Sequence, residues 1–187
     1  MTTCTEQQSQ LSEEILARIS SDLSMITDRE FQVEGMQCEL AEERAAGKDK
    51  IHISFKLGFR HESGEVQHGC VLMPLADAIS LACFLMMMPD DGVKQKRAVT
   101  DLDESLKDAL IEVSNFVGGA TDAALREAIG MGIKVRSEGC QGVRPDVRPA
   151  FIYDEGQELL VTRAKARIHE FEEFEMVAMI PPLGEPQ

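Results

Sequence analysis

Apolar residues recur at regular spacing in the first part of the chain and predict one helix and three strands. Apolar side chains at every third or fourth position predict a helix over 11–26, with Ser12 as its N-cap. Strict alternation of apolar and polar residues predicts a strand over 51–59, and weaker alternation predicts strands over 31–40 and 66–73. The first part of the chain is therefore predicted to run helix, strand, strand, strand.

The most apolar stretch follows these strands and covers residues 70–89. Pro74 splits it and Asp77 lies in its longer part, so the uninterrupted portion is too short to cross a bilayer. We expect a helix over 75–88 and then a break over 88–95. Because this helix is apolar nearly all round, we expect the chain to form a homodimer, either through it or through sheet edges.

The order of a helix and three strands then returns in the second part of the chain. Thr100 or Asp101 is the expected N-cap of the second long helix, and Gly130 is expected to end it. The predicted elements are a helix over 101–129, a short strand around Val135, a loop over 137–149 and hairpin strands over 159–168 and 174–180.

Two copies of the same order predict an α/β (α+β) protein in which an antiparallel-rich sheet packs against two long helices. Residues 16–21 can be laid against residues 110–115, which brings the two long helices into register. The expected organisation is a disordered N-terminus over 1–10, a single domain over 11–181 with pseudo-repeats at 11–90 and 98–181, and a tail over 182–187.

Composition argues against several classes of function. Nineteen Lys and Arg against 33 Asp and Glu give a formal charge of −14, so nucleic acid and anionic membrane surfaces are not expected partners. Residues 1–10 lack the basic and apolar regions of a signal peptide. The five cysteines form no CxxC pair, which favours reduced, buried thiols in a cytoplasmic protein. His52, His61 and His68 are scattered, and no metal site is expected.

A polar stripe on the second long helix is the strongest candidate for a site. At 100° per residue, Asp108, Glu112, Asn115 and Gly119 fall on one exposed strip, opposite the apolar face of the helix. Polar outer faces are usually only solvated. Here, however, Asn is a below-average helix former placed mid-helix, and the adjacent Gly118 and Gly119 together cost about 2 kcal/mol relative to Ala. The stripe therefore predicts a surface that another molecule approaches closely.

The spacing Asp108-x3-Glu112-x2-Asn115, within DALIEVSNFVGGATDAAL, resembles the signature of the CheC/CheX/FliY family of bacterial chemotaxis phosphatases. The preceding GEVQHGCVLMPLADAISLACFLMMM is similar to the strand and helix before that signature, and the resemblance covers most of 11–181. Arg18 and Ser21 take the places of Glu112 and Asn115 in the first copy. One active copy is more similar to CheX than to CheC.

This resemblance implies a phosphatase that removes the phosphoryl group from an aspartate of CheY, a response regulator of two-component signalling. Asn115 would orient the attacking water and Glu112 would pair with a lysine of the regulator. Asp108, Glu112 and Gly119 would contact the partner. The Mg²⁺ ion would be supplied by the regulator, so the protein would carry no cofactor of its own.

One departure and two alternatives accompany this interpretation. The family places a proline 23 positions after the Asn, whereas Glu138 stands there, and Pro145 and Pro149 are the next prolines. The first alternative is a non-catalytic response-regulator-binding module related to the flagellar switch proteins. The second is a structural domain whose match to the motif is accidental.

Overall fold

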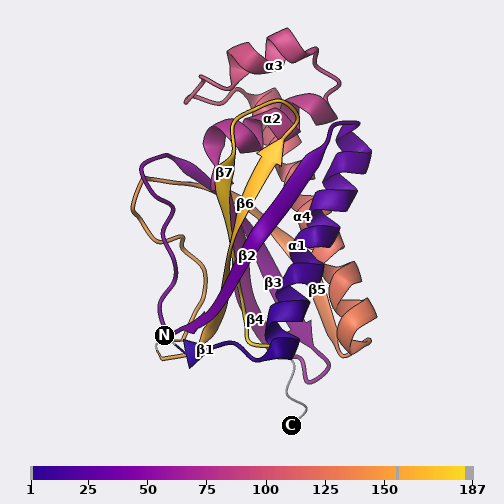
Figure 1. Ribbon diagram of the computed structural model, residues 1–187, viewed down its shortest axis with the longest axis vertical. Coiled ribbons are helices and arrows are strands. Elements are labelled where there is room, and N and C mark those ends of the chain that lie inside the picture. The colour runs from indigo at the N-terminus through magenta and orange to yellow at the C-terminus, as the bar shows by residue number, and fades with distance from the viewer. Residues whose placement is uncertain (1, 155, 184–187) are drawn as a thin grey trace.

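The elements follow the predicted repeat, with one short helix added between the two copies (Figure 1). The computed structural model describes residues 2–154 and 156–183. Its elements are β1 (Thr2–Thr3), α1 (Glu6–Thr27), β2 (Phe31–Ala41), β3 (His52–His61), β4 (Val66–Pro74), α2 (Leu75–Leu85), α3 (Asp90–Lys96), α4 (Glu104–Ile129), β5 (Ile133–Val143), β6 (Leu159–Ile168) and β7 (Phe174–Ile180).

The described strands form one antiparallel sheet in the order β1-β2-β6-β7-β4-β3-β5. If β2 is exchanged with β5, β3 with β6 and β4 with β7, the order of the six long strands is read in reverse, and each strand keeps the same neighbours. The sheet therefore has a pseudo-two-fold axis at the β4–β7 pair, which confirms the repeat and the α+β class expected from the sequence.

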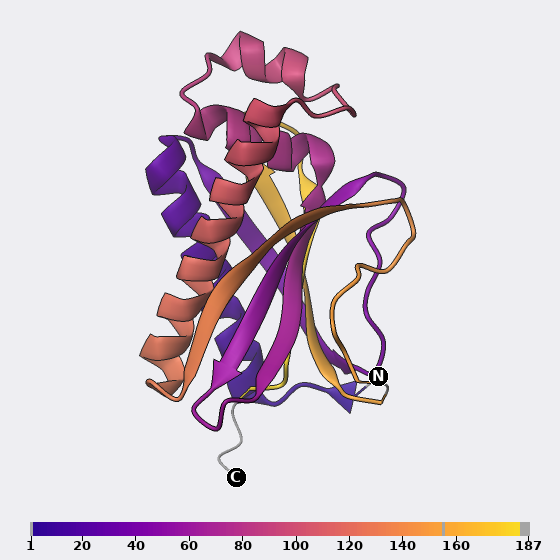
Figure 2. The ribbon, with the colours of Figure 1, turned by 180° about the vertical axis from the view of Figure 1, so that it is seen from behind.

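The two long helices lie side by side and cover one face of the sheet (Figures 1 and 2). Alternation sends Phe55, Leu57 and Phe59 of β3 into this main core, where each is fully buried. A smaller apolar cluster occupies the opposite face, where Phe151 and Tyr153 from the connection before β6 pack against the strands. The helices thus lie on one side of the sheet, which leaves the outer faces of α1 and α4 to solvent.

The N-terminal prediction was wrong in two respects. Residues 1–10 were expected to be disordered, but β1 and the first turns of α1 occupy this region. Thr5, not Ser12, is the N-cap: its side chain accepts from the Gln8 N–H, and the Gln8 side chain accepts from the Thr5 N–H. This reciprocal capping box starts the helix one and a half turns earlier than the apolar spacing indicates. Ser12 lies buried inside the helix.

The segment between the copies also differs from its prediction. The expected break over 88–95 contains the helix α3, and α2 ends at Leu85. Nearly all of α2 is buried within the chain itself, against the sheet and α4. Its apolar character is therefore explained by intramolecular packing and gives no reason to expect self-association through this helix. A homodimer formed through sheet edges stays a prediction.

The second copy contains a longer strand than expected. β5 extends to Val143, so the first half of the expected loop over 137–149 is paired with β3. Of the expected tail, Leu183 is buried, and residues 184–187 lie outside the described residues. None of the helices in the described part of the chain combines the length and the apolarity that a membrane crossing requires.

Candidate functional site

The candidate site lies on α4, which begins one turn later than its sequence suggests. Asp103, rather than Thr100 or Asp101, is the N-cap, and its carboxylate accepts the Leu106 N–H at 2.9 Å. That hydrogen bond, together with Lys96 nearby, lowers the pKa of Asp103. The carboxylate therefore stays ionised at neutral pH and suits the positive end of the helix.

The outer face of α4 is arranged as its period predicts. Asp108, Glu112, Asn115 and Gly119 are all exposed, and the side chains of the opposite face are buried. Residues 112 and 115 are neighbours across one helical turn, where Cβ atoms lie about 5–6 Å apart. A carboxylate and a carboxamide can therefore contact two groups of one partner at the same time.

The flank of α4 beside Asn115 is fixed to β5 by several direct contacts. The Ser114 hydroxyl lies 2.7 Å from the Ser137 hydroxyl and donates to the Gly139 carbonyl at 3.0 Å. About two turns further along, the Asp122 carboxylate accepts the Val135 N–H at 2.8 Å. Because side-chain bonds hold the helix to the strand on both sides of Asn115, its carboxamide projects from a rigid support.

The paired glycines of α4 have different causes. A Cβ added at Gly118 would lie 2.7 Å from the Ser137 nitrogen, so this glycine permits the close approach of α4 to β5. A Cβ added at Gly119 would meet nothing within 4 Å. From the sequence we expected both glycines to make room for an approaching partner. For Gly118 that expectation was wrong, because the approaching chain is the protein's own strand.

Glu138, which stands where the family that the sequence resembles has a proline, lies in a β-bulge opposite Ser114. The register of β3 with β5 shifts between Phe55 and Leu57, so residues 138 and 139 together face Lys56. The Glu138 carboxylate reaches across Gly58 to His68 on β4, with 2.8 Å between its oxygen and the ring Nδ1. A bulge and a cross-strand pair thus hold the segment that supports α4, where a proline would supply stiffness instead.

An exposed isoleucine beside the stripe was missed by the sequence analysis. Ile111 lies four residues before Asn115 and three after Asp108, and 46% of its surface is exposed. Isoleucine is a poorer helix former than alanine and gains nothing from water contact. At 100° per residue Ile111 falls beside the polar stripe and far from the apolar face, so the helical wheel predicts its exposure, and only its apolar side chain kept it out of the stripe.

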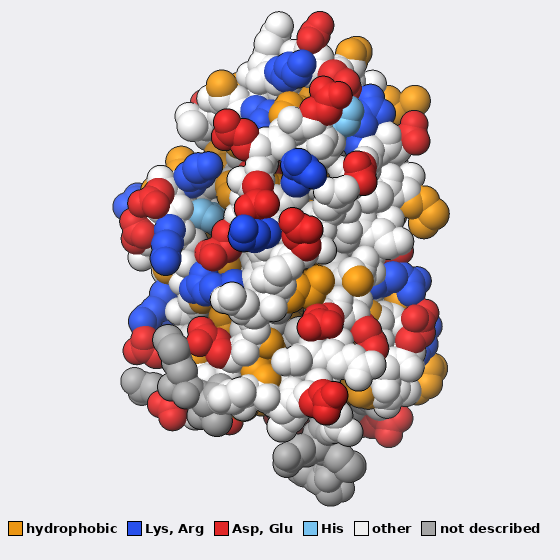
Figure 3. All heavy atoms as spheres, in the orientation of Figure 1, with side chains coloured by type: hydrophobic (Ala, Val, Ile, Leu, Met, Phe, Trp, Pro, Cys, Tyr) orange, Lys and Arg blue, Asp and Glu red, His pale blue; other side chains and the backbone are white. Residues whose placement is uncertain are grey.

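The first copy lacks the same chemistry on its outer face, which is part of the surface in Figure 3. Arg18, in the place of Glu112, pairs with Asp22 at 3.0 Å and with Glu127 of α4 at 2.9 Å. Ser21 stands in the place of Asn115 and is exposed. Ser20 repeats the role of Ser114, since its hydroxyl donates to the Phe31 carbonyl of β2. The copies therefore share their packing but not their surface groups.

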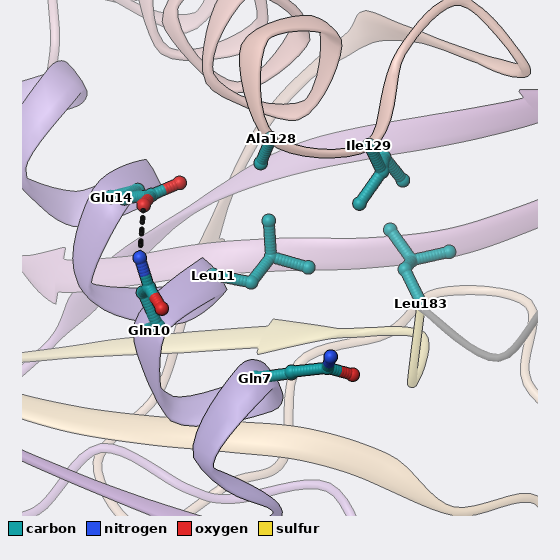
Figure 4. A pocket seen from close by; sticks show the side chains of 7 residues that line it. All are labelled: Gln7, Gln10, Leu11, Glu14, Ala128, Ile129 and Leu183. Carbon is teal, nitrogen blue, oxygen red and sulfur yellow. Dashed lines mark hydrogen bonds between the residues drawn. The ribbon is translucent and has the colours of Figure 1, made fainter.

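Other candidate sites in the described residues carry less chemistry. A hollow between the start of α1 and the end of α4 is lined by glutamines, Glu14 and apolar side chains, and Gln10 donates to Glu14 at 3.0 Å (Figure 4). Among residues 2–154 and 156–183, no three His, Cys, Asp or Glu side chains are grouped so that they could hold a metal ion.

Comparisons with known proteins find the same fold in several solved structures. FliY from Thermotoga maritima matches with a TM-score of 0.66 at 16% identity, over 97% of this chain and 92% of FliY. The FliM middle domain from H. pylori matches with a TM-score of 0.62 at 11% identity, over 95% and 94%. CheX from Desulfovibrio desulfuricans matches with a TM-score of 0.56 at 16% identity, over 90% and 97%. The chain has the fold of CheX, FliY and FliM.

The same fold therefore occurs in a chemotaxis protein, in FliY and in the FliM middle domain. No protein-family model matches the sequence, and no curated protein matches it either. The fold by itself therefore does not decide between catalysis and binding, and the residues on α4 must carry that argument.

Proposed function

We propose that this protein hydrolyses the aspartyl-phosphate of a CheY-like response regulator. The observation that carries the proposal is the exposed pair Glu112 and Asn115, one turn apart on a rigid helix. Among the described residues, no side-chain hydrogen bond or ion pair involves Glu112 or Asn115, whereas their neighbours Lys107 and Ser114 do form such contacts. Both groups are therefore available to a partner.

A carboxamide suits this reaction because phosphoryl transfer needs positioning and charge stabilisation more than covalent help. The Asn115 oxygen accepts a hydrogen bond from water and aims it in line at phosphorus, while the Asn115 NH₂ group donates to a phosphoryl oxygen. The new bond forms between water oxygen and phosphorus, and the bond between phosphorus and the aspartyl oxygen breaks. The products are the regulator's aspartate, inorganic phosphate and a proton. The Mg²⁺ that neutralises the phosphoryl charge belongs to the regulator.

Glu112 would dock the partner by pairing with a lysine in the regulator's active site. Its exposed carboxylate is one turn from Asn115, so the lysine and the water would lie on the same side of the phosphoryl group. Asp108 extends the acidic surface by a further turn. Open space over Gly119 would let the partner's backbone approach the helix.

Ile111 is the apolar contact that we propose for the same interface. It is exposed within a polar face and adjoins both Asp108 and Asn115 on the helix. Interfaces gain much of their affinity from a few apolar anchors surrounded by polar groups. Ile111 would therefore contribute to affinity without taking part in the chemical step.

A second candidate is a non-catalytic module that binds the regulator or a flagellar switch protein. The FliM middle domain has the same fold, with a TM-score of 0.62, but the fold alone does not decide between the two candidates. A module of this kind needs an exposed surface, but it does not need a carboxamide beside a carboxylate.

Turnover distinguishes the two candidates. Phosphorylated regulator is mixed with the protein at one-twentieth of its concentration, and the remaining phosphorylated form is followed with time. A phosphatase empties the whole pool, whereas a binding module changes the decay of at most one regulator per molecule of protein.

Replacing the docking carboxylate tests the assignment of Glu112. Glu112→Ala should weaken binding of the phosphorylated regulator by about tenfold or more and lower turnover with it, because a charge pair is lost. Glu104→Ala is a matched control, since this carboxylate is also exposed on α4 but pairs with Lys107 at 2.9 Å. Equal effects of the two substitutions would contradict a specific role for Glu112.

A further inference from the structure

Two of the five cysteines lie in contact although 34 residues separate them. The Sγ atoms of Cys4 and Cys38 are 2.8 Å apart, and both residues are half-buried rather than enclosed. Cys38 also lies 3.8 Å from the Ser12 hydroxyl of α1. The pair thus stands where the N-terminal segment, the edge strand and the first helix meet, on elements that the proposed phosphatase site does not use.

The backbone around the pair has the geometry that a disulfide requires. Thr2 pairs with Leu40 and Thr3 with Glu39, and continuing this antiparallel register places Cys4 directly opposite Cys38. Residues opposite each other in an antiparallel pair have Cα atoms about 4.5–5.5 Å apart. This separation falls within the range of about 4.4–6.8 Å found across disulfides.

We propose that Cys4 and Cys38 form a reversible disulfide when the protein meets a peroxide. The Cys38 thiolate attacks one oxygen of hydrogen peroxide, the O–O bond breaks, and hydroxide leaves a sulfenic acid on Cys38. The Cys4 sulfur then attacks the Cys38 sulfur, and the hydroxyl group departs as water with the Cys4 proton. Two thiols lose two electrons in total, and one peroxide is reduced to two molecules of water.

The order of the two sulfurs follows from their surroundings. Burial and the neighbouring Cys38 thiol raise the pKa of Cys4 to about 12, so Cys4 stays protonated at neutral pH. The thiolate is the form of cysteine that attacks peroxide, so the protonated Cys4 is assigned the second, resolving step.

The remaining cysteines are poorly placed to compete. Cys70 and Cys83 are buried, and burial raises the pKa of Cys70 to about 12 and that of Cys83 above its ordinary value. Cys140 is half-buried on β5, and burial raises its pKa as well. Selective oxidation at Cys4 and Cys38 is the expected result.

The bond would fasten a weakly held segment. β1 has two paired residues and contacts β2, and Thr5, which caps α1, follows Cys4 directly. A covalent link would hold β1 on the edge of β2 and fix the start of α1. Closing a loop of this length also restricts the unfolded chain, so oxidation should raise the thermal midpoint by roughly 5–10 °C.

Peptide mapping tests the proposal on the full chain. The protein is treated with a small excess of hydrogen peroxide at neutral pH, alkylated in denaturant and digested with trypsin. The expected product joins residues 1–18 to residues 30–44, with a mass about 2 Da below the sum of the two peptides, and dithiothreitol should separate them. Alkylated Cys4 and Cys38, an unresolved Cys38 sulfenic or sulfinic acid, or a different cross-linked pair would each overturn it.

Serine variants keep the test independent of the mass measurement. The oxidation-dependent rise in thermal midpoint should vanish in both Cys4→Ser and Cys38→Ser. Cys140→Ser is the matched control, because Cys140 is also half-buried, and it should keep the full rise. A rise that survives in Cys4→Ser would contradict the pairing.

Discussion

At the scale of single residues, helical periodicity predicts some features of α4 and leaves others unexplained. The exposure of Asp108, Glu112 and Asn115 follows from a 100° rotation per residue, and the structure confirms it. The reason for Gly118 could not be predicted, because Ser137 lies 19 residues away and its approach depends on how β5 pairs. Tertiary contacts of this kind leave no local pattern in the sequence.

The two neighbouring glycines provide a matched test of this distinction. Gly118→Ala should destabilise the protein by about 1–3 kcal/mol, because the new methyl group overlaps the backbone of β5. Gly119→Ala should stabilise it by about 0.5–1 kcal/mol, because alanine is the better helix former and the space is open. Urea unfolding of both variants measures the difference. Equal destabilisation by the two substitutions would contradict the packing described for α4.

Ile111 allows a second test at this scale, with a control on the same helix. Ile111→Ala should weaken binding of the phosphorylated regulator by about tenfold and leave the rate at saturation nearly unchanged, because only an apolar contact is removed. Ile129→Ala removes a side chain of similar exposure, 41% against 46%, at the far end of α4. If both variants bind like the parent, Ile111 lies outside the interface, and the roles of Glu112 and Asn115 are unaffected.

At the scale of elements, long periodic segments were predicted well and short or irregular ones were not. β6 and β7 have the expected bounds because the second half of β6 alternates and β7 is an apolar run that Pro181 ends. α3 was missed because Gly92 and two aspartates in seven residues are typical of a turn. β5 was expected to be shorter because Gly139 has the composition of a loop, whereas here it takes a positive φ within a bulge.

The junction of α2, α3 and the β6–β7 turn depends on one buried ion pair. Arg97 donates to Asp77 at 2.9 Å and lies 4.2 Å from the centre of the Phe171 ring. Burial raises the pKa of Asp77, and Arg97 opposes this effect. Arg97→Ala should therefore cost about 3 kcal/mol at pH 7, since it leaves a buried carboxylate without its partner.

The sign of the pH dependence checks this explanation. Without Arg97 the pKa of Asp77 in the folded protein rises further above its unfolded value, so ionised Asp77 destabilises the variant at neutral pH. As the pH falls through this raised pKa, Asp77 gains a proton and the difference in unfolding free energy from the parent should shrink. Urea unfolding at pH 7 and pH 5 measures it, with the exposed Lys94→Ala as control. A difference that does not change with pH would point to lost packing alone.

At the scale of the whole molecule, the repeat could be predicted but the sheet order could not. A helix followed by three strands, repeated once, indicates an internal duplication, but beyond the expected hairpin of β6 and β7 it does not say which strands pair. The observed order places β4 beside β7 at the centre and brings α1 and α4 together on one face. This arrangement gives every residue of the α4 stripe a counterpart on α1, and so provides an internal control for function.

The most direct test of the phosphatase proposal uses that control. Phosphorylated regulator is mixed with catalytic amounts of the parent protein, Asn115→Ala or Ser21→Ala, and loss of phosphate is followed with time. Removing one group that contacts the transition state should slow the Asn115→Ala reaction by about 10²–10³-fold, with folding unchanged or slightly improved because alanine favours the helix. Ser21→Ala, on the counterpart position of α1, should match the parent. Parental activity in Asn115→Ala would contradict the proposal and favour the binding module.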